Sequence, residues 1–165
     1  MQLPEPVDRA DGALADPTEI ARRCAEVMYA DDLASRHLGI RITDVTPGRA
    51  VATMVVTEEM TNGHGICHGG YVFLLADTAF AFACNTYDRV TVAAAADVVF
   101  LAPTRLGDEL AAEGLERQRF GRSGIYDVTV RRADGSVVAE FRGNSRAIGG
   151  SLLFADTGSG EGTRS

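Results

Sequence analysis

The stretch that decides the fold is NGHGICHGGYVFLLADTAFAFAC, residues 62–84. From Gly69 to Cys84 it is almost wholly apolar, which predicts one helix that other elements must enclose, because a helix that is apolar on every side is buried. Asp77 stands out within it. An unpaired charge is costly to bury, so this carboxyl must be protonated, hydrogen-bonded or used in chemistry.

The flanking segments predict a single antiparallel sheet around that helix. Asp16-Pro17 begins a helix that extends to about His37, with a break near residues 31–32. Two strands are expected next, and after the central helix the pattern stays strand-like, with alternating apolar and polar residues in 124–131. The expected strands are 40–45, 50–56, 91–101, 109–119, 125–132 and 137–147.

The fold class is therefore α+β, with an antiparallel sheet wrapped around a central apolar helix and an additional N-terminal helix. We expect residues 1–16 to be a flexible leader and residues 17–148 to form one domain. Residues 149–165 are rich in Gly, Ser and Thr and are expected to be a disordered tail.

Composition restricts the partners. The chain has 165 residues, 45% of them hydrophobic and 24% charged, as in a soluble globular protein. Its net charge of −7 argues against nucleic acid as a partner. The longest apolar stretch is too short to span a membrane. The 3 cysteines show no metal-ligand spacing, so we expect reduced thiols, no structural metal and a cytoplasmic protein.

The glycines before the central helix suggest an anion site. The first N–H groups of a helix have no internal partner and lie at the positive end of its dipole, so they can stabilise the oxyanion that forms when a carbonyl is attacked. Asp77 comes eight residues after Gly69, which is about 12 Å along a helix. One carbonyl cannot contact both groups of the same chain. If both act on it, they come from two chains, which predicts an obligate two-fold dimer.

Simpler interpretations remain open for these residues. Asp77 could be a hydrogen-bonded structural residue, and His64 or His68 could cap the turn. Cys67 beside His68 suggests a nucleophile and its base, but no third group orients the imidazole.

The motif Asn62-Gly-His-Gly-Ile-Cys-His-Gly-Gly, followed by Leu75-Ala-Asp-Thr-Ala, closely resembles the hotdog-fold acyl-CoA thioesterases of the phenylacetate-degradation type. The similarity covers about Met28 to Gly150. It extends to the segments 38–40, 100–103, 107–108, 124–128 and 141–145.

The resemblance implies dimers, commonly assembled as dimers of dimers into homotetramers. It makes Asp77 the catalytic carboxylate and the Gly69 N–H the group that polarises the thioester carbonyl. Asp31 stands where the family often has Asn near the acyl group. The other expected substrate-binding residues are Asn62, His68, Gly70, Phe100 and Leu101, with Arg122, Ser123, Arg142 and Arg146 as candidates for the CoA phosphates.

The expected reaction is hydrolysis of an acyl-CoA to the free acid and CoA. Phenylacetyl-CoA, hydroxyphenylacetyl-CoA and related aromatic thioesters are the expected substrates, and medium aliphatic ones remain open. Asp77 acts as general base or as a nucleophile that forms a mixed anhydride. No cofactor is implied, since CoA is part of the substrate. The alternatives are an acyl-CoA hydratase or dehydratase with His68 as base, and a non-catalytic acyl-CoA-binding protein.

Overall fold

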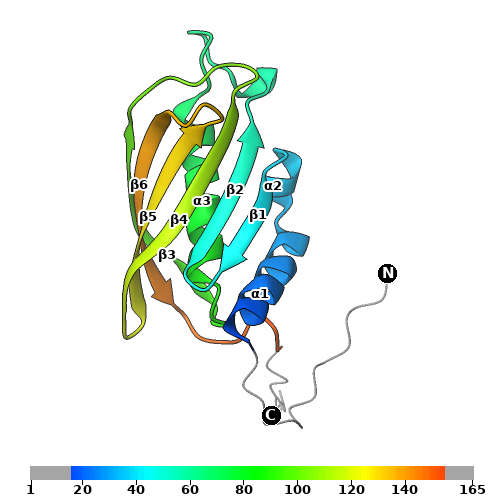
Figure 1. The fold of residues 1–165 in the computed structure, drawn as a ribbon, viewed down its shortest axis with the longest axis vertical. Coiled ribbons are helices and arrows are strands. Elements are labelled where there is room, and N and C mark those ends of the chain that lie inside the picture. Colours follow the sequence, from blue (N-terminus) through cyan, green and yellow to red (C-terminus); the bar gives the residue numbers. More distant parts are fainter. Residues whose placement is uncertain (1–15, 155–165) are drawn as a thin grey trace, which may run out of the picture.

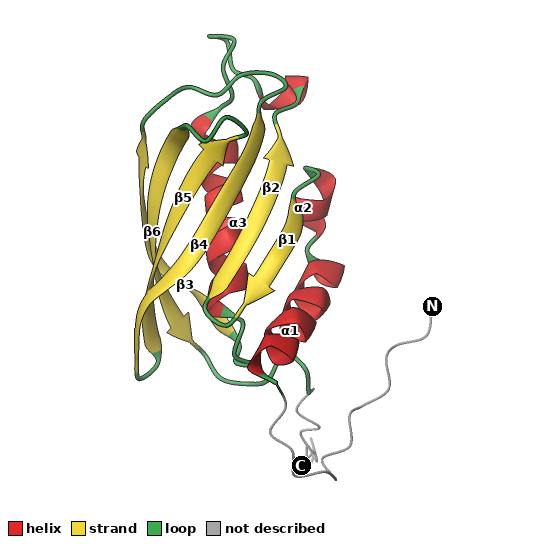
Figure 2. Ribbon diagram, viewed as in Figure 1, coloured by secondary structure: helices red, strands yellow, loops and turns green. Residues whose placement is uncertain are grey.

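A six-stranded antiparallel sheet curves around one central helix, which is the hotdog architecture that the resemblance implies (Figures 1 and 2). The computed structural model describes residues 16–154. The strands lie in the order β1-β2-β4-β5-β6-β3. The elements are α1 (Pro17–Asp31), α2 (Leu33–His37), β1 (Arg41–Thr46), β2 (Arg49–Val55), η1 (Glu58–Met60), α3 (Gly69–Cys84), β3 (Thr91–Phe100), β4 (Glu109–Phe120), β5 (Ser123–Arg132) and β6 (Val137–Ala147).

The N-terminal helix begins and breaks where the sequence predicts. The side chain of Asp16 accepts a hydrogen bond of 3.0 Å from the Thr18 N–H, and Pro17 occupies the first turn, where its missing N–H does no harm. The side chain of Asp32 then accepts from the Ser35 N–H at 2.9 Å. Because Asp32 caps a second helix, the break separates α1 from α2 and sets α2 against α3.

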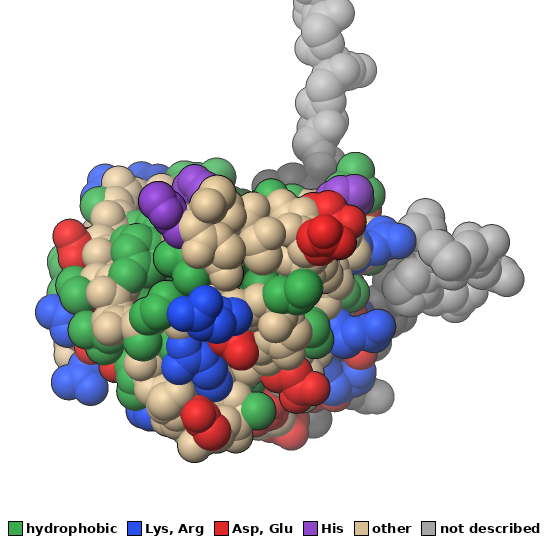
Figure 3. Space-filling model, turned by 90° about the horizontal axis from the view of Figure 1, so that it is seen from above, with side chains coloured by type: hydrophobic (Ala, Val, Ile, Leu, Met, Phe, Trp, Pro, Cys, Tyr) green, Lys and Arg blue, Asp and Glu red, His purple; other side chains and the backbone are tan. Residues whose placement is uncertain are grey.

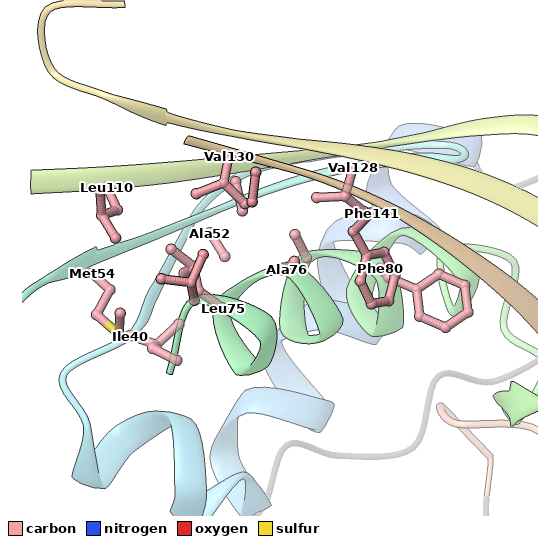
Figure 4. Close-up of a cluster of buried hydrophobic side chains, with 14 of the residues drawn as sticks. Ile40, Ala52, Met54, Leu75, Ala76, Phe80, Leu110, Val128, Val130 and Phe141 are labelled. Atoms are coloured by element: carbon pink, nitrogen blue, oxygen red, sulfur yellow. The ribbon is translucent and has the colours of Figure 1, made fainter. Parts of the chain in front are cut away.

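Helix α3 is buried because the sheet comes very close to it (Figure 4). A Cβ at Gly114 of β4 would lie 2.9 Å from the carbonyl oxygen of Ala79, and one at Gly143 of β6 would lie 2.7 Å from the ring of Phe80. The Phe80 ring in turn contacts Tyr126 of β5, with 5.6 Å between ring centroids. Glycine at these two strand positions lets the sheet close around the helix.

The two edges of the sheet differ. Strand β1 runs beside α1 (Figure 1), whereas β3 forms the opposite edge. Residues 92–97 of β3 are exposed, and all of them except Asp97 are apolar. A long apolar edge strand is a template for pairing with another chain.

The C-terminal boundary lies further along the chain than the expected domain end. Asp88 holds residues 151–153 through its carboxylate, which accepts from the Ser151 hydroxyl at 2.7 Å and from the N–H groups of Leu152 and Leu153 at 2.8 and 2.9 Å. Part of the segment assigned to the tail is therefore attached to the domain. The rest of that tail, and all but Asp16 of the expected leader, lie outside the described residues.

Candidate active site

The first backbone N–H of α3, that of Gly69, is unused within residues 16–154. His68 is the N-cap: its Nδ1 accepts a hydrogen bond of 3.1 Å from the Gly70 N–H, and its carbonyl accepts from the Tyr71 N–H at 3.0 Å. Within residues 16–154, nothing accepts from the N–H of Gly69. This donor lies at the positive end of α3, so it is suited to bind a developing oxyanion.

The loop before α3 is held in place by its own hydrogen bonds. The side chain of Asn62 accepts from the His64 N–H at 2.9 Å, and its backbone N–H donates to the carbonyl of Ile66 at 2.8 Å. The His68 N–H donates to the carbonyl of Met60 at 2.8 Å. These contacts fix the position of His68, and hence of Gly69, relative to the rest of the domain.

Phe100 and Leu101 lie beside this helix start. The Phe100 ring is packed against Gly69, and Leu101 follows it at the end of β3, where its N–H donates to the carbonyl of Val138. Both side chains are exposed. Figure 3 shows the end of the molecule that lies uppermost in Figure 1, where histidine side chains lie near hydrophobic ones.

Asp77 lines a pocket of about 380 Å³ between α3 and the α1–α2 region. Burial raises the pKa of the Asp77 carboxyl above its ordinary range. No group among residues 16–154 donates a hydrogen bond or forms an ion pair with this carboxylate, so the structural interpretation of Asp77 has no partner to support it. Its neighbour Thr78 does have one, since its hydroxyl lies 3.4 Å from that of buried Ser35.

The same pocket contains the position expected near the acyl group. Asp31 and Asp32 line it together with Asp77. Asp32 already accepts from the Ser35 N–H, whereas Asp31 is exposed. The remaining lining is mostly apolar and comes from Met28, Ala34, Ser35, Leu74, Thr78, Ala81 and Phe82.

Arginines gather at the opposite end of α3, around the turn between β4 and β5. A small cleft of about 40 Å³ is lined by Arg89, Arg119 and Arg122, with Ser123 among its other residues. Arg122 donates through Nε to the carbonyl of Ala147 at 3.0 Å. The guanidinium of Arg119 lies 3.5 Å from the centroid of the Tyr87 ring. Planar guanidinium groups of this kind suit phosphate recognition.

Arg142 lies elsewhere. Its side chain projects from the outer face of the sheet, whereas that of the adjacent Phe141 points to the inner face. Arg142 donates two hydrogen bonds of 2.6 and 2.9 Å to Asp127. Of the expected phosphate-binding residues, Arg122 and Ser123 share the cleft, and Arg146 reaches Ser123 with an Nη1–Oγ distance of 3.5 Å. Arg142 is outside that group, and its charge is already compensated.

The cysteine interpretation loses support. Cys67 is buried, and burial raises the pKa of its thiol, which disfavours the reactive thiolate. The Sγ atom of Cys67 lies 3.6 Å from the carbonyl oxygen of His68, and His68 uses Nδ1 for the helix cap.

The candidate residues other than Arg142 therefore fall into three groups along α3. One surrounds the Gly69 N–H, one surrounds Asp77, and one lies at the turn between β4 and β5. Gly69 and Asp77 are eight residues apart on a continuous helix, or about 12 Å along its axis, so one chain does not bring them to the same carbonyl.

Residues 16–154 contain no group of three or more His, Cys, Asp or Glu side chains that could hold a metal ion. No helix in this part of the chain has the length and apolar character needed to cross a membrane.

Comparison with known proteins agrees with the architecture. Residues 64–139 match the thioesterase superfamily. The chain is 44% identical over 128 residues to the acyl-coenzyme A thioesterase PaaI of Escherichia coli, a match that covers 78% of this chain and 91% of that one.

Solved structures give the same result. The E. coli PaaI protein from the phenylacetic acid degradation operon superimposes with a TM-score of 0.81 and 43% identity, covering 82% of this chain and 99% of that one. A mutant form of the phenylacetic acid degradation protein PaaI from Thermus thermophilus superimposes with a TM-score of 0.68 and 32% identity. That match covers 71% of this chain and 100% of that one. By its sequence and by the sheet wrapped around α3, this chain belongs to the thioesterase superfamily, as a hotdog protein of the PaaI type.

Proposed function

We propose that this protein hydrolyses acyl-CoA thioesters at a site shared by two chains, with Asp77 of one chain and the Gly69 N–H of the other. The observation that carries the proposal is the presence of two unused groups on α3. Within residues 16–154, Asp77 is a carboxylate without a hydrogen-bond or ion-pair partner in its pocket, and Gly69 offers an N–H without an acceptor at the helix start.

In the general-base route, Asp77 takes a proton from water as the water oxygen attacks the thioester carbonyl. The carbonyl oxygen becomes an oxyanion, and the Gly69 N–H and the dipole of α3 stabilise it. Collapse of the tetrahedral intermediate breaks the C–S bond, and the proton held by Asp77 passes to the sulfur of CoA. In the nucleophilic route, Asp77 itself attacks, the C–S bond breaks, and the departing CoA thiolate takes a proton from solvent. Water then hydrolyses the mixed anhydride to the free acid and restores the Asp77 carboxylate. The free carboxylate oxygens suit either route.

The open edge of β3 supports the dimer. If two β3 strands pair antiparallel about a two-fold axis, the α3 helices of the two chains also run antiparallel. When two copies of one helix run antiparallel about a two-fold axis, the residue numbers of each facing pair add up to the same value. Pairing Gly69 with Asp77 puts the axis at the level of Phe73, midway between them. The assembly would hold two equivalent sites per dimer, and two dimers could associate into a homotetramer.

We further propose that the substrates carry aromatic acyl groups such as phenylacetyl or hydroxyphenylacetyl. The association of E. coli PaaI with phenylacetic acid degradation supports this choice. Within the site, Asp31 contacts the acyl group from the Asp77 pocket, Asn62 and Leu101 contact substrate near the Gly69 N–H, and Phe100 packs against the residue that carries this N–H. Arg122 and Ser123 bind the phosphates of CoA, and Arg89 and Arg119 line the same cleft.

The hydratase alternative receives less support. It requires His68 as a base, yet Nδ1 of His68 accepts from the Gly70 N–H, so the neutral ring carries its hydrogen on Nε2. Nε2 could accept a proton only if the hydrogen moved to Nδ1, which would break the cap of α3.

The test is a thiol-release assay over a panel of acyl-CoA thioesters, with Asp77→Asn as the matched variant. Hydrolysis predicts release of free thiol, with kcat lowered by about 10²-fold or more in Asp77→Asn. Crotonyl-CoA consumed without thiol release would favour the hydratase. Tight binding of CoA thioesters, with turnover unaffected by Asp77→Asn, would favour the non-catalytic binding protein.

A further inference from the structure

Gly69 is not required by its own backbone conformation. Its φ does not fall in the left-handed region, where glycine is favoured. A side chain here would be crowded by the ring of Phe100, which would have to shift by a few tenths of an ångström. A Cβ at residue 69 would lie 3.0 Å from Cζ of Phe100 and 3.3 Å from its Cε1 and Cε2. Glycine here marks a place where an aromatic ring packs directly against the backbone that carries the unused N–H.

The neighbouring glycine meets a different ring. A Cβ at Gly70 would lie 3.3 Å from Nδ1 of His68, the atom that accepts the Gly70 N–H. The two glycines thus have separate purposes, since Gly70 admits the capping imidazole and Gly69 admits Phe100. Both rings therefore pack against the residues that begin α3, and Phe100 is the ring beside the residue that carries the unused N–H.

The close contact of Phe100 with Gly69 is unusual because the Phe100 side chain is not part of the buried core. Phe100 is the last residue of β3, and its side chain is 53% exposed. Its position on the strand turns it toward α3, as with the partly buried Val98, while Val99 between them lines the outer face of the sheet. A ring that stays half exposed contributes less burial energy than a core residue, so core packing does not account for this contact.

We propose that Phe100 is a positioning residue that shields the Gly69 N–H from water. The inference rests on the proposed function, in which this N–H binds the thioester oxygen. An aromatic ring is a much weaker hydrogen-bond acceptor than a thioester oxygen, so it does not replace substrate. A ring packed on residue 69 occupies space beside the N–H that water would otherwise fill. A hydrogen bond to an oxyanion is stronger where water is excluded. Negative charge on the oxygen grows toward the transition state, so the effect falls on kcat more than on KM.

The first experiment compares Phe100→Ala with Val99→Ala in the full chain. Val99 is a matched control because it is the adjacent residue, is apolar and is 52% exposed on the opposite face. We expect Phe100→Ala to lower kcat about tenfold, a fraction of the 10²–10³-fold loss typical when an oxyanion donor is removed, with KM within about twofold. Val99→Ala should keep wild-type kcat, and Phe100→Tyr, which retains the ring, should restore most of it.

Thermal unfolding and the size of the assembly are measured on the same samples. The inference requires that kcat falls in Phe100→Ala while Tm and assembly size match those of Val99→Ala. Wild-type kcat in Phe100→Ala would overturn it. An equal loss of kcat in Val99→Ala would also overturn the inference. A loss of kcat in Phe100→Ala that is accompanied by a lower Tm or a smaller assembly would overturn it too. If Phe100→Ala fails to fold, Phe100→Leu takes its place under the same criteria.

A double variant tests the contact itself. The methyl group of Gly69→Ala displaces the ring by a few tenths of an ångström, so its kcat should fall, but by less than that of Phe100→Ala. The variant with both substitutions should be no worse than Phe100→Ala alone, because both act on one contact. Additive losses would overturn the inference.

Asp77→Asn separates this inference from the proposed function. Loss of hydrolysis in Asp77→Asn with full kcat in Phe100→Ala would leave the proposed function standing and remove only the role of Phe100. Hydrolysis that survives Asp77→Asn would overturn the proposed function and the role of Phe100 with it.

Discussion

The N–H of Gly70 donates a hydrogen bond of 3.1 Å to Nδ1 of His68. This bond satisfies one of the orphan donors at the start of α3 and leaves the adjacent Gly69 N–H available. The two glycines of the motif are therefore not equivalent.

We expect His68→Ala to lower the free energy of unfolding by about 1 kcal/mol, since it removes a side-chain cap. For a domain of this size, that corresponds to a Tm lower by about 2–4 °C. His68→Asn is the matched control, because Asn caps helices well, and it should retain most of the stability. Urea or thermal unfolding measures both variants. An equal loss in the two would show that the cap is not what His68 contributes.

The rate of hydrolysis should depend on the ionisation of Asp77. The carboxylate must be deprotonated to accept a proton or to attack, and burial raises its pKa. Activity should therefore fall, as the pH is lowered, at a pH above the ordinary Asp value of about 3.9. The pH dependence of kcat/KM measures this limb, and a limb at or below the ordinary value would contradict the assigned role.

The same shift predicts that Asp77 costs the fold some stability at neutral pH. A carboxyl whose pKa is higher in the folded state adds stability that is fully present below the unfolded pKa, about 3.9, and is lost as the pH rises through the folded pKa. Asp77→Asn cannot ionise. It should unfold at a higher temperature than wild type at pH 7, and the difference should shrink as the pH is lowered toward about 4.

The size of this gain is limited because the carboxylate is partly exposed, so solvent screens it. We expect the rise in Tm of Asp77→Asn to be smaller than the shift of about 2–4 °C that corresponds to 1 kcal/mol. Thermal unfolding at several pH values is the measurement, and a Tm lower than wild type at pH 7 would show that Asp77 has a stabilising partner.

Two arginines that the sequence treats alike should behave differently. Arg122→Ala should raise KM for acyl-CoA by about tenfold or more with kcat little changed, because a charge-assisted contact to phosphate is lost in ground and transition state alike. Arg142→Ala should leave both constants unchanged, since Arg142 is paired with Asp127 on the outer face. Steady-state kinetics on one substrate suffice, and a KM effect confined to Arg142→Ala would reverse the assignment.

The fold was largely predictable because its signals are local. The apolar run around Asp77 indicates an enclosed helix, Asp16 and Asp32 mark helix starts, and alternation marks the strands. The short helix η1 was missed because three residues carry no periodic pattern. The alternation of inward and outward side chains along a strand also predicts the position of Arg142. Arg142 stands between Phe141 and Gly143, which face α3, so its side chain must face away from α3.

The sequence names the candidate residues but not their contacts. The eight-residue spacing of Gly69 and Asp77 by itself places these two groups too far apart for one carbonyl to contact both in a single chain. The packing of Phe100 on Gly69 joins positions 31 residues apart in the chain, and no local pattern announces it. The hydrogen bonds between the Asp88 carboxylate and residues 151–153 are not predictable from the sequence for the same reason.

The most direct test of the shared site is a purified heterodimer of two inactive variants. One chain carries Gly69→Pro, which removes the N–H and suits a first helical position after the extended backbone of His68, with a small shift of the Phe100 ring to admit its Cβ. The other carries Asp77→Asn. The two chains have different affinity tags, so that the mixed dimer can be isolated and its thiol release measured. A shared site predicts about half of wild-type activity, because one of the two sites is intact. A heterodimer as inactive as its parents would contradict the account.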